Sequence, residues 1–355
     1  MKMMKKVMSA AVVAVSIVGC NGQSTGGTEL KLAEQNLGPN NELYGSDTLK
    51  GALVAANNDS GAGLLYAGTG SSVGETCLRG GGSAVCPNPQ QQALAPMSRD
   101  LRTPCQPGER SNVIALDAVN VWVNQDNGLT NISRDNVANL FFKTYRRTVN
   151  GVVTTINGAC WTDWSQVPGS TRTGPITIYR RDDLSGTTEV FKEKVAENTS
   201  ASFCDGIVTI HDGATSNPAP CTTADSATVC IGKLTASDLI AIGFAGDSAI
   251  YPFPPAQPNN LKLDVDGIPS NPSNIRKLIT GQPGVYPLAR KIFLNENTTS
   301  PRSVEEDILY SYIYDTNTED FEEILEAQGF IACDDSAPLK CGGLNDDGRG
   351  AGNCQ

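Results

Sequence analysis

The sequence predicts an exported α/β protein that folds as two lobes, and three observations support this prediction. From residue 40 onward, short apolar runs alternate with helical patterns, as they do in proteins whose sheets are covered by helices. The chain after its first twenty residues is longer than a single hydrophobic core usually supports, which favours two lobes. A charged start followed by an apolar run opens the chain, which is typical of an export signal.

The first twenty residues predict the compartment. Lys2, Lys5 and Lys6 precede the apolar run 7–18, which is too short to span a bilayer core of roughly 30 Å. The run ends in Ile-Val-Gly-Cys, a pattern that resembles a lipobox, so we expect Cys20 to become the acylated N-terminus. A plain secretory signal with an incidental cysteine is the alternative.

The acidic composition limits the class of partner. The formal net charge of −11 becomes −11 − 3 = −14 once the three signal lysines are removed. This charge opposes nucleic acid or anionic lipid as a general partner, so a bound anion would need a local site. No second apolar stretch approaches membrane length, and we therefore expect the lipid to be the only membrane contact.

The cysteines predict disulfides rather than a metal site. Setting Cys20 aside leaves ten of the eleven cysteines, an even number in an exported chain. No CxxC pair occurs and His211 is the only histidine, so zinc would need an all-cysteine site and no metal or cofactor is expected. From proximity in the sequence we expect Cys77 to pair with Cys86. We also expect one pair within Cys204, Cys221 and Cys230 and another within Cys333, Cys341 and Cys354. Cys105 and Cys160 remain unassigned.

Helices are expected at 48–56, 133–143, 187–197, 271–279 and 303–328, and strands around 63–67, 112–123, 175–179 and 239–245. Two insertions, 77–110 and 198–230, are rich in Gly, Pro, Ser and Thr and hold most of the cysteines. We expect them to be surface loops that are stabilised by disulfides. The run Asn345 to Gly348 resembles a calcium loop but lacks its spacing, which favours a cross-linked acidic tail.

Three polar segments, 45–49, 68–75 and 180–189, each resemble the start of a helix. Such starts offer free backbone N–H groups, hydroxyl donors and the positive end of a helix dipole, which together suit a multiply charged anion. The third segment adds arginines that can bind two oxygens of an oxyanion at once. Each signal is weak alone, but their combination predicts an anion site.

In these segments and beyond them, the sequence resembles the phosphate-binding subunit of bacterial phosphate ABC transporters over residues 42–331. The resemblance implies a two-lobed periplasmic binding protein of the type II-like class, with crossover strands 113–123 and 239–245 forming a hinge, and a non-enzymatic function. The matching motifs, in family order, are Gly45–Leu49, Gly68–Ser72, Ala95–Asp100, the strand 113–123, the segment 129–142, Arg181–Thr187, Ala241–Phe244 and Tyr286–Arg290.

The resemblance also implies a division of the chain. We expect a signal peptide at 1–19, the lipidated cysteine and a tether at 20–39, a discontinuous first lobe at 40–115 and 240–331, a second lobe at 116–239, and a cysteine-rich tail at 332–355.

By the same resemblance, the ligand would be bound from both lobes. Asp183 would orient Arg181 through an ion pair. The expected ligand contacts are Thr48, the backbone of Leu49, Ser71, Ser98 and Arg99 from one side, and Arg181, Ser185, Gly186 and Thr187 from the other.

One departure from the family pattern bears on selectivity. Where the best-known phosphate binders have Ser-Asp, this chain has Ser98-Arg99, so the carboxylate that accepts the proton of monohydrogen phosphate is missing there. Arg99 would instead add a charge-assisted contact. We hypothesise that Asp47 or Asp100 supplies the missing acceptor.

The expected function is reversible binding of inorganic phosphate by a monomeric, lipid-anchored protein of the cell envelope, with an ABC permease as a candidate partner and no nucleic acid. Asn21 after the acylated cysteine favours the outer membrane. Another tetrahedral oxyanion, such as sulfate, arsenate or molybdate, is the alternative ligand. A hydrolase of phosphate esters is disfavoured by the single histidine and the missing GxSxG motif. A structural or adhesive lipoprotein that has lost the ligand is disfavoured because the expected hydrogen-bond donors Thr48, Ser71, Arg181, Ser185 and Thr187 are all present.

Overall fold

The computed structural model of the protein describes residues 41–80, 86, 92–102, 104–183, 185–253, 256–316 and 318–332. They all belong to one compact unit, Gln35–Gln355, which is separate from the unit Met1–Glu34. The predicted signal, Cys20, the tether and the tail beyond Ala332 lie outside the described residues. Among the helices that are described, none is long and apolar enough to cross a membrane.

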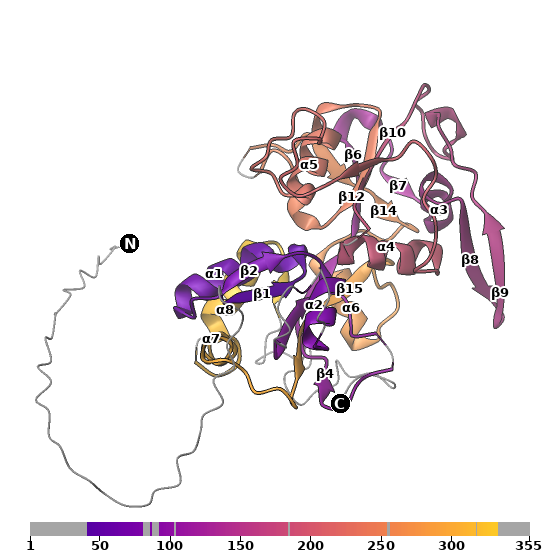
Figure 1. Ribbon diagram of the computed structural model, residues 1–355. Helices are drawn as coiled ribbons and strands as arrows, with labels where there is room; N and C mark the ends of the chain where they lie inside the picture. Colours follow the sequence, from indigo (N-terminus) through magenta and orange to yellow (C-terminus); the bar gives the residue numbers. More distant parts are fainter. Residues whose placement is uncertain are drawn as a thin grey trace, which may run out of the picture. The chain divides into compact units, whose positions relative to one another are not determined.

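The first sheet and the two-stranded sheet beside it contain the strands from the two ends of the described chain (Figure 1). Its order is β16-β5-β15-β3, with β4 paired to β15, and these pairings are antiparallel. A parallel pair, β1 with β2, lies beside β3. The strands are β1 (Glu42–Gly45), β2 (Leu65–Gly68), β3 (Leu94–Met97), β4 (Glu109–Arg110), β5 (Val113–Ala118), β15 (Ala289–Asn297) and β16 (Ile331–Ala332).

The second sheet has the order β11-β10-β12-β6-β13. Strand β10 is parallel to β11 and β12, while β6 is antiparallel to its neighbours. A short parallel pair, β7 with β14, and the hairpin β8–β9 complete this part. The strands are β6 (Asn120–Asn124), β7 (Asn131–Ile132), β8 (Thr144–Val149), β9 (Val152–Asn157), β10 (Thr177–Arg181), β11 (Val208–Ile210), β12 (Ala241–Ala245), β13 (Asn260–Lys262) and β14 (Asp264–Val265).

The helices are α1 (Lys50–Ser60), α2 (Ser71–Leu78), α3 (Arg134–Phe141), α4 (Gly186–Ala196), α5 (Ala227–Ser237), α6 (Pro272–Thr280), α7 (Val304–Ser311) and α8 (Thr318–Ala327). Four of the five predicted helices are confirmed within a few residues. The prediction of one helix over 303–328 is wrong, because the π-helical segment Tyr312–Thr316 separates α7 from α8. That segment contains Ile, Asp and Thr, which have low helix propensity.

The chain passes from the first sheet to the second within one extended run. Strands β5 and β6 are separated only by Val119, so the predicted strand 113–123 belongs to both sheets. The expected second crossover differs: β12 lies inside the second sheet between β10 and β6, β13 pairs with β6 at its edge, and the chain rejoins the first sheet at β15. The apolar run of β12 therefore serves a buried central strand, since all of its residues are buried.

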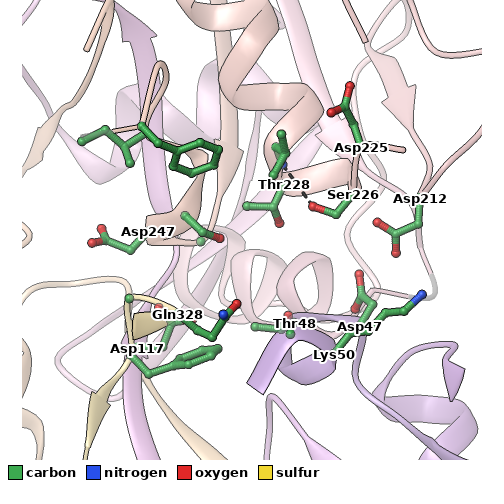
Figure 2. Close-up of a pocket in the computed structure, with 18 of the residues that line it drawn as sticks. Asp47, Thr48, Lys50, Asp117, Asp212, Asp225, Ser226, Thr228, Asp247 and Gln328 are labelled. Atoms are coloured by element: carbon green, nitrogen blue, oxygen red, sulfur yellow. Dashed lines mark hydrogen bonds between the residues drawn. The ribbon is translucent and has the colours of Figure 1, made fainter. Parts of the chain in front are cut away.

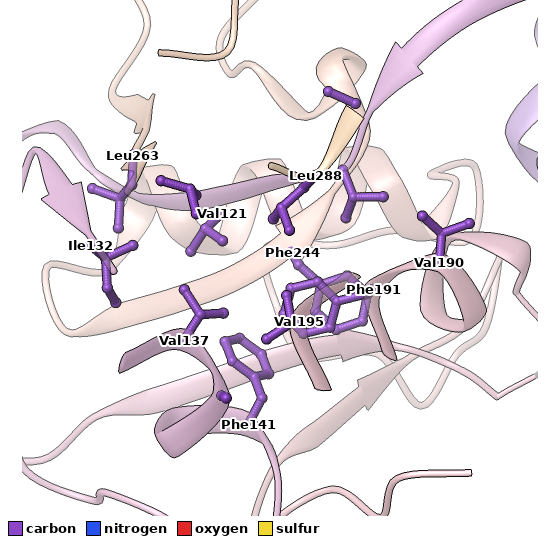
Figure 3. Close-up of a cluster of buried hydrophobic side chains, with 14 of the residues drawn as sticks. Val121, Ile132, Val137, Phe141, Val190, Phe191, Val195, Phe244, Leu263 and Leu288 are labelled. Carbon is purple, nitrogen blue, oxygen red and sulfur yellow. The ribbon is translucent and has the colours of Figure 1, made fainter. Parts of the chain in front are cut away.

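A cluster of phenylalanines fixes helix α4 on the second sheet (Figure 3). Phe191 of α4 is fully buried and stacks on Phe244 of β12, with ring centroids 3.8 Å apart. Phe141 of α3 contacts Phe191 edge-on at 5.0 Å. Truncating such a side chain to alanine typically costs about 3–5 kcal/mol. The N-terminus of α4, which carries three predicted site residues, is therefore held on a well-packed element.

Three disulfides are formed between described cysteines, Cys77–Cys86, Cys160–Cys204 and Cys221–Cys230. The first confirms the pairing predicted from proximity, and the third confirms the expected pair within the second insertion. Cys160, which the sequence left unassigned, pairs with Cys204, and Cys105 is also disulfide-bonded. The expected pair within Cys333, Cys341 and Cys354, and the calcium-like run, lie outside the described residues.

Candidate functional site

The three polar segments each begin a helix, as predicted. Ser46 caps the turn before α1, and its Oγ accepts a hydrogen bond from the N–H of Thr48 at 3.2 Å. The N–H of Leu49 donates to the Ser46 carbonyl at 3.2 Å. Because the turn already uses these two N–H groups, the Thr48 hydroxyl is the more accessible donor of this segment.

Ser71 and Ser98 form a fully buried pair of hydroxyls. Ser71 is the first residue of α2, and its Oγ accepts from the N–H of Ser98 at 3.0 Å. The two Oγ atoms lie 3.2 Å apart. The structure thus brings together two predicted contacts that are far apart in the sequence.

The start of α4 lies directly against this pair of serines. Ser185 is the N-cap, and its Oγ accepts from the N–H of Thr187 at 3.2 Å. A Cβ on Gly186 would overlap with Ser98 Oγ and Ser71 Oγ, so any larger residue would force the two serines or the helix start to shift. The start of α4, on the second sheet, is therefore in contact with Ser71, which follows β2, and with Ser98, which follows β3 of the first sheet.

Arg181 ends strand β10 and is only 1% exposed. Its Nη1 donates to Thr228 Oγ1 at 2.9 Å, and its Nη2 forms an ion pair with Asp47 and lies 3.6 Å from Asp212. Burial lowers the pKa of Arg181, and Asp212 and Asp182 raise it. An arginine nevertheless remains charged at neutral pH.

The expected ion pair between Asp183 and Arg181 is not formed. Asp183 pairs instead with Arg180 at 3.1 Å and with Lys192 at 3.0 Å, and its side chain is 58% exposed. Successive residues of a strand point to opposite faces, so Arg180 and Arg181 diverge, and Asp183 lies on the side of Arg180. Asp47 orients Arg181 in its place.

Arg99 does not take the place that the sequence suggested. Its Nε donates to Glu189 of α4 at 2.6 Å, its Nη2 to Glu75 of α2 at 2.6 Å and its Nη1 to the Asp100 carbonyl at 2.7 Å. These three acceptors engage every nitrogen of the guanidinium group. The N-cap of α2 is Gly70, which makes no side-chain cap bond.

A second buried arginine, missed by the sequence reasoning, supports the site. Arg290 of β15 donates from Nε to Asp117 of β5 at 2.9 Å and from Nη1 to Thr187 Oγ1 at 3.1 Å. Thr187 Oγ1 also lies 3.0 Å from Thr48 Oγ1. Burial raises the pKa of Asp117, and Arg290 lowers it. Arg290 ends the motif Tyr286–Arg290, but nothing in the sequence indicated that it lies next to Thr187.

Asp212 and Thr228 were missed because they belong to the insertion expected to be only a surface loop. The interpretation of 198–230 as a surface loop is therefore incomplete, since α5 and the segment before it supply two partners of Arg181. A cysteine-rich composition masked the apolar pattern of α5, in which Ile231 and Leu234 are buried.

A cavity of about 850 Å³ opens beside Arg181 (Figure 2). In the figure, Asp47, Thr48 and Lys50 face Thr228 and the start of α5 across the cavity. A smaller cavity of about 230 Å³ is lined by Asp47 and Ser185. Of the predicted ligand residues, Thr48 and Arg181 line the larger cavity and Ser185 lines the smaller one.

Apart from Arg181 Nη2, which is in the ion pair with Asp47, two buried atoms of these side chains have no hydrogen-bond partner among the described residues: Arg181 Nε and Asp47 Oδ1. One is a donor and the other an acceptor. Buried polar groups are nearly always hydrogen-bonded in folded proteins, so this pair indicates a site for a small polar ligand. Among all the residues that the structure describes, no group of three or more His, Cys, Asp or Glu side chains is arranged to hold a metal ion.

A family model described as a PBP superfamily domain matches residues 109–298, which is more than half of the chain. The protein belongs to the PBP superfamily. Among curated proteins, a stretch of 49 residues is 45% identical to Alkaline phosphatase L of Pseudomonas aeruginosa (strain UCBPP-PA14). That stretch spans 14% of this superfamily member and only 12% of the relative.

Solved structures share the fold of this PBP superfamily member. An ABC-type phosphate transport receptor from Vibrio cholerae aligns with a TM-score of 0.56 at 16% identity, over 82% of this chain and 98% of the receptor. A putative phosphate ABC transporter substrate-binding protein from Clostridium perfringens, solved with bound phosphate, aligns with a TM-score of 0.57 at 16% identity, over 82% and 99%. These likenesses confirm the predicted α/β binding-protein fold.

Proposed function

We propose that this protein binds inorganic phosphate reversibly at the corner formed by Arg181, Thr48 and the start of α4. The observation that carries the proposal is the buried guanidinium of Arg181, whose Nε lacks a partner among the described residues. Arginine binds the oxygens of tetrahedral anions well, and the N-terminus of a helix adds backbone N–H groups and a favourable dipole. The Ser71, Ser98 and Thr187 hydroxyls supply further donors. The Vibrio protein is a phosphate transport receptor and the Clostridium protein was solved with bound phosphate, which supports the same ligand.

Asp47 is the better candidate for the missing proton acceptor. Its Oδ1 is buried and unpartnered beside Arg181, so a ligand that satisfies both groups must accept from the arginine and donate to the carboxylate. Monohydrogen phosphate does both, whereas sulfate has no proton at neutral pH. Asp100, the other candidate, already accepts from the N–H of Leu101 at 2.7 Å and from Ser111. Burial raises the pKa of Asp100.

The wider function that we propose is that of a lipid-anchored binding protein which delivers phosphate to an ABC permease or collects it at the cell surface, without chemical change. The two sheets would belong to two lobes that close on the ligand, with β5–β6 as one connection. Cys20 would carry the lipid, and the outer membrane is the favoured location. A Cys20→Ser variant should move from the membrane to the soluble fraction and lose incorporation of labelled palmitate; unchanged partition would contradict the anchor.

The test of the ligand is calorimetric titration of the full-length protein, purified in detergent and freed of bound anion, with phosphate and then sulfate at neutral pH. Phosphate binding that disappears in Arg181→Ala would support the proposal. Binding of sulfate or molybdate alone would keep an oxyanion receptor but change its ligand. No binding of any oxyanion would favour the structural or adhesive alternative.

Hydrolysis of phosphate esters is a second candidate, because the stretch of 45% identity belongs to a protein named as an alkaline phosphatase. The described site argues for binding instead. His211 is half exposed and lies 3.6 Å from Asp182, and no other histidine exists to act as a base. Steady release of p-nitrophenol from p-nitrophenyl phosphate that is lost in Arg181→Ala would favour hydrolysis.

A further inference from the structure

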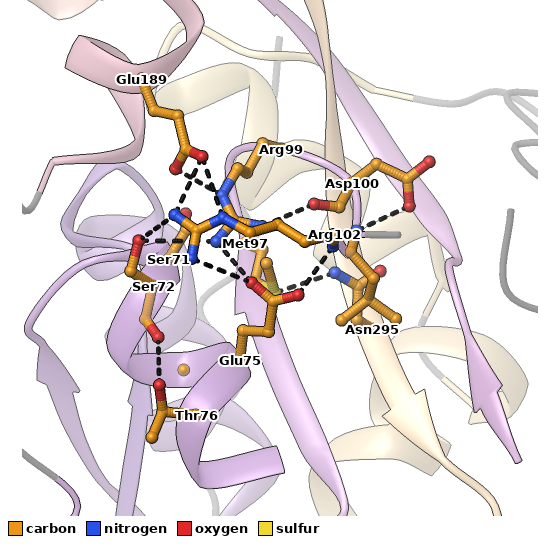
Figure 4. A network of polar contacts seen from close by, with 12 residues as sticks. Ser71, Ser72, Glu75, Thr76, Met97, Arg99, Asp100, Arg102, Glu189 and Asn295 are labelled. Carbon is orange, nitrogen blue, oxygen red and sulfur yellow. Dashed lines mark hydrogen bonds and ion pairs between the residues drawn. The ribbon is translucent and has the colours of Figure 1, made fainter. Parts of the chain in front are cut away.

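A network of charged side chains joins the two sheets beside the proposed anion site (Figure 4). Arg99 and Arg102 follow β3 of the first sheet, and Glu189 lies in the first turn of α4 on the second. Arg99 Nε donates to Glu189 Oε2 at 2.6 Å, and Arg102 Nη2 donates to Glu189 Oε1 at 3.0 Å. Both oxygens of one carboxylate are therefore bound by arginines from the other sheet.

Glu75 of α2 holds the arginine side of this network in place. Its Oε2 accepts from Arg99 Nη2 at 2.6 Å, and its Oε1 accepts from the backbone N–H of Arg102 at 2.7 Å. Arg79 adds a further ion pair to Glu75 at 3.1 Å. Glu75 thus orients the guanidinium of Arg99 toward Glu189. This reduces the side-chain entropy that Arg99 loses when it binds Glu189.

The burial of the network decides how much it contributes. The side chains of Arg99 and Glu75 are 7% and 4% exposed, and that of Glu189 is 18% exposed, whereas Arg102 is 52% exposed. Exposed ion pairs contribute little, but hydrogen bonds between charged groups away from water are stronger. The pair of Arg99 and Glu189 is therefore the main contact, and Arg102 is a lesser one.

The position of Glu189 links this contact to the ligand donors. Its N–H donates to the carbonyl of Ser185 at 3.2 Å, one turn from the Ser185–Thr187 segment. Arg99 directly follows Ser98 in the chain. The network therefore holds the ligand donors of one sheet next to those of the other. All of its bonds are made between protein groups, so it does not need the ligand to form.

We propose that Arg99, Arg102 and Glu189 form an ionic clasp that stabilises the closed arrangement of the two sheets independently of ligand. The inference rests on the proposed function only in taking phosphate as the probe. These three side chains act by holding the two sheets together and not by touching the ligand. The clasp favours the closed form whether or not the anion is present, so it slows both the entry and the release of ligand. Arg99, which the sequence suggested as a ligand contact, therefore stabilises the closed form instead.

The test compares Glu189→Gln with Glu193→Gln, the same change one turn later on α4, where the side chain is 53% exposed. Stopped-flow kinetics of phosphate binding to the full-length protein should show dissociation accelerated about tenfold in Glu189→Gln. Association should also be faster, because the open form is more populated. Damage to the anion site itself would accelerate release without accelerating entry. Arg102→Gln should give a smaller acceleration of both rates.

A second measurement does not depend on phosphate. Labels on Val54→Cys in α1 and Val153→Cys in β9, both exposed positions, report the separation of the two sheets by energy transfer. The transfer efficiency should differ between Glu189→Gln and Glu193→Gln in phosphate-free buffer. Equal efficiencies, or rates that are the same in both variants, would overturn the clasp. Absence of phosphate binding in the unmutated protein would reject the proposed function, while the transfer measurement would still test the clasp.

Discussion

Arg181 and Arg99 are both buried arginines near the end of a strand, and each reaches a carboxylate that comes from the opposite sheet. Every nitrogen of Arg99 has an acceptor, two from carboxylates and one from a carbonyl. Arg181 keeps its Nε unpartnered within the described structure, next to the unpartnered Oδ1 of Asp47.

This difference distinguishes an arginine whose nitrogens are all hydrogen-bonded from one that still has an unpartnered nitrogen. A satisfied guanidinium has little to gain from an anion, because the anion would have to displace existing charged hydrogen bonds. An arginine with an unpartnered nitrogen beside a cavity gains strongly from an anion.

Arg181→Ala should weaken phosphate binding at least about a hundredfold, because it removes a buried charged donor and leaves Asp47 unpaired. Arg180→Ala is the matched control, since this neighbour points to the other face and lies over Phe203. Titration calorimetry measures both. Equal losses in the two variants would contradict the special role of Arg181.

Asp47→Asn should lower the preference for phosphate over sulfate by about tenfold or more, since the acceptor for the phosphate proton is replaced by an amide and the repulsion of sulfate is removed. Asp100→Asn should leave the preference unchanged, because that carboxylate already bonds to Leu101 and Ser111. Competition of sulfate against bound radiolabelled phosphate gives the ratio. Unchanged selectivity in both variants would sink the hypothesis.

Gly186→Ala should reduce phosphate affinity about tenfold while the protein stays folded, since overpacking typically costs about 1–3 kcal/mol and the new Cβ meets Ser98 Oγ and Ser71 Oγ. Gly246→Ala is the control, because its nearest neighbours are 3.9 and 4.0 Å from the added carbon. Thermal unfolding with and without phosphate reports both quantities. Full affinity in Gly186→Ala would show that this contact between the sheets is loose.

Thr228→Val should reduce affinity about fivefold, because one neutral acceptor of Arg181 is lost while the shape of the side chain is kept. Calorimetry again gives the ratio to the unmutated protein. A loss as large as that of Arg181→Ala would mean that α5, and not the arginine, is the dominant binding element.

The sequence predicted many of the elements, but it missed β3 and α5, which lie at least partly in the insertions expected to be surface loops. It predicted the contacts between elements less well. Local patterns were sufficient for the strand shared by the two sheets and for the helix starts at Thr48, Ser71 and Thr187, because periodicity and capping are local properties. The partners of Arg181 were not predictable in this way. Asp183 is near it in the chain but on the opposite face, whereas Asp47 comes from another sheet. Long-range pairing of charges depends on how the strands are ordered, which a single sequence does not reveal.

The disulfide between Cys221 and Cys230 has a consequence for how tightly the protein binds the anion. It closes a short loop that carries Ser226, the N-cap of α5, and so it fixes the turn that presents Thr228 to Arg181. A closed loop loses less entropy on ordering than an open one. Without this disulfide, both sheets should still form, but the Thr228 hydroxyl would be held less firmly against Arg181. We therefore expect the reduced protein to bind the proposed anion more weakly, by no more than the roughly fivefold loss expected for Thr228→Val.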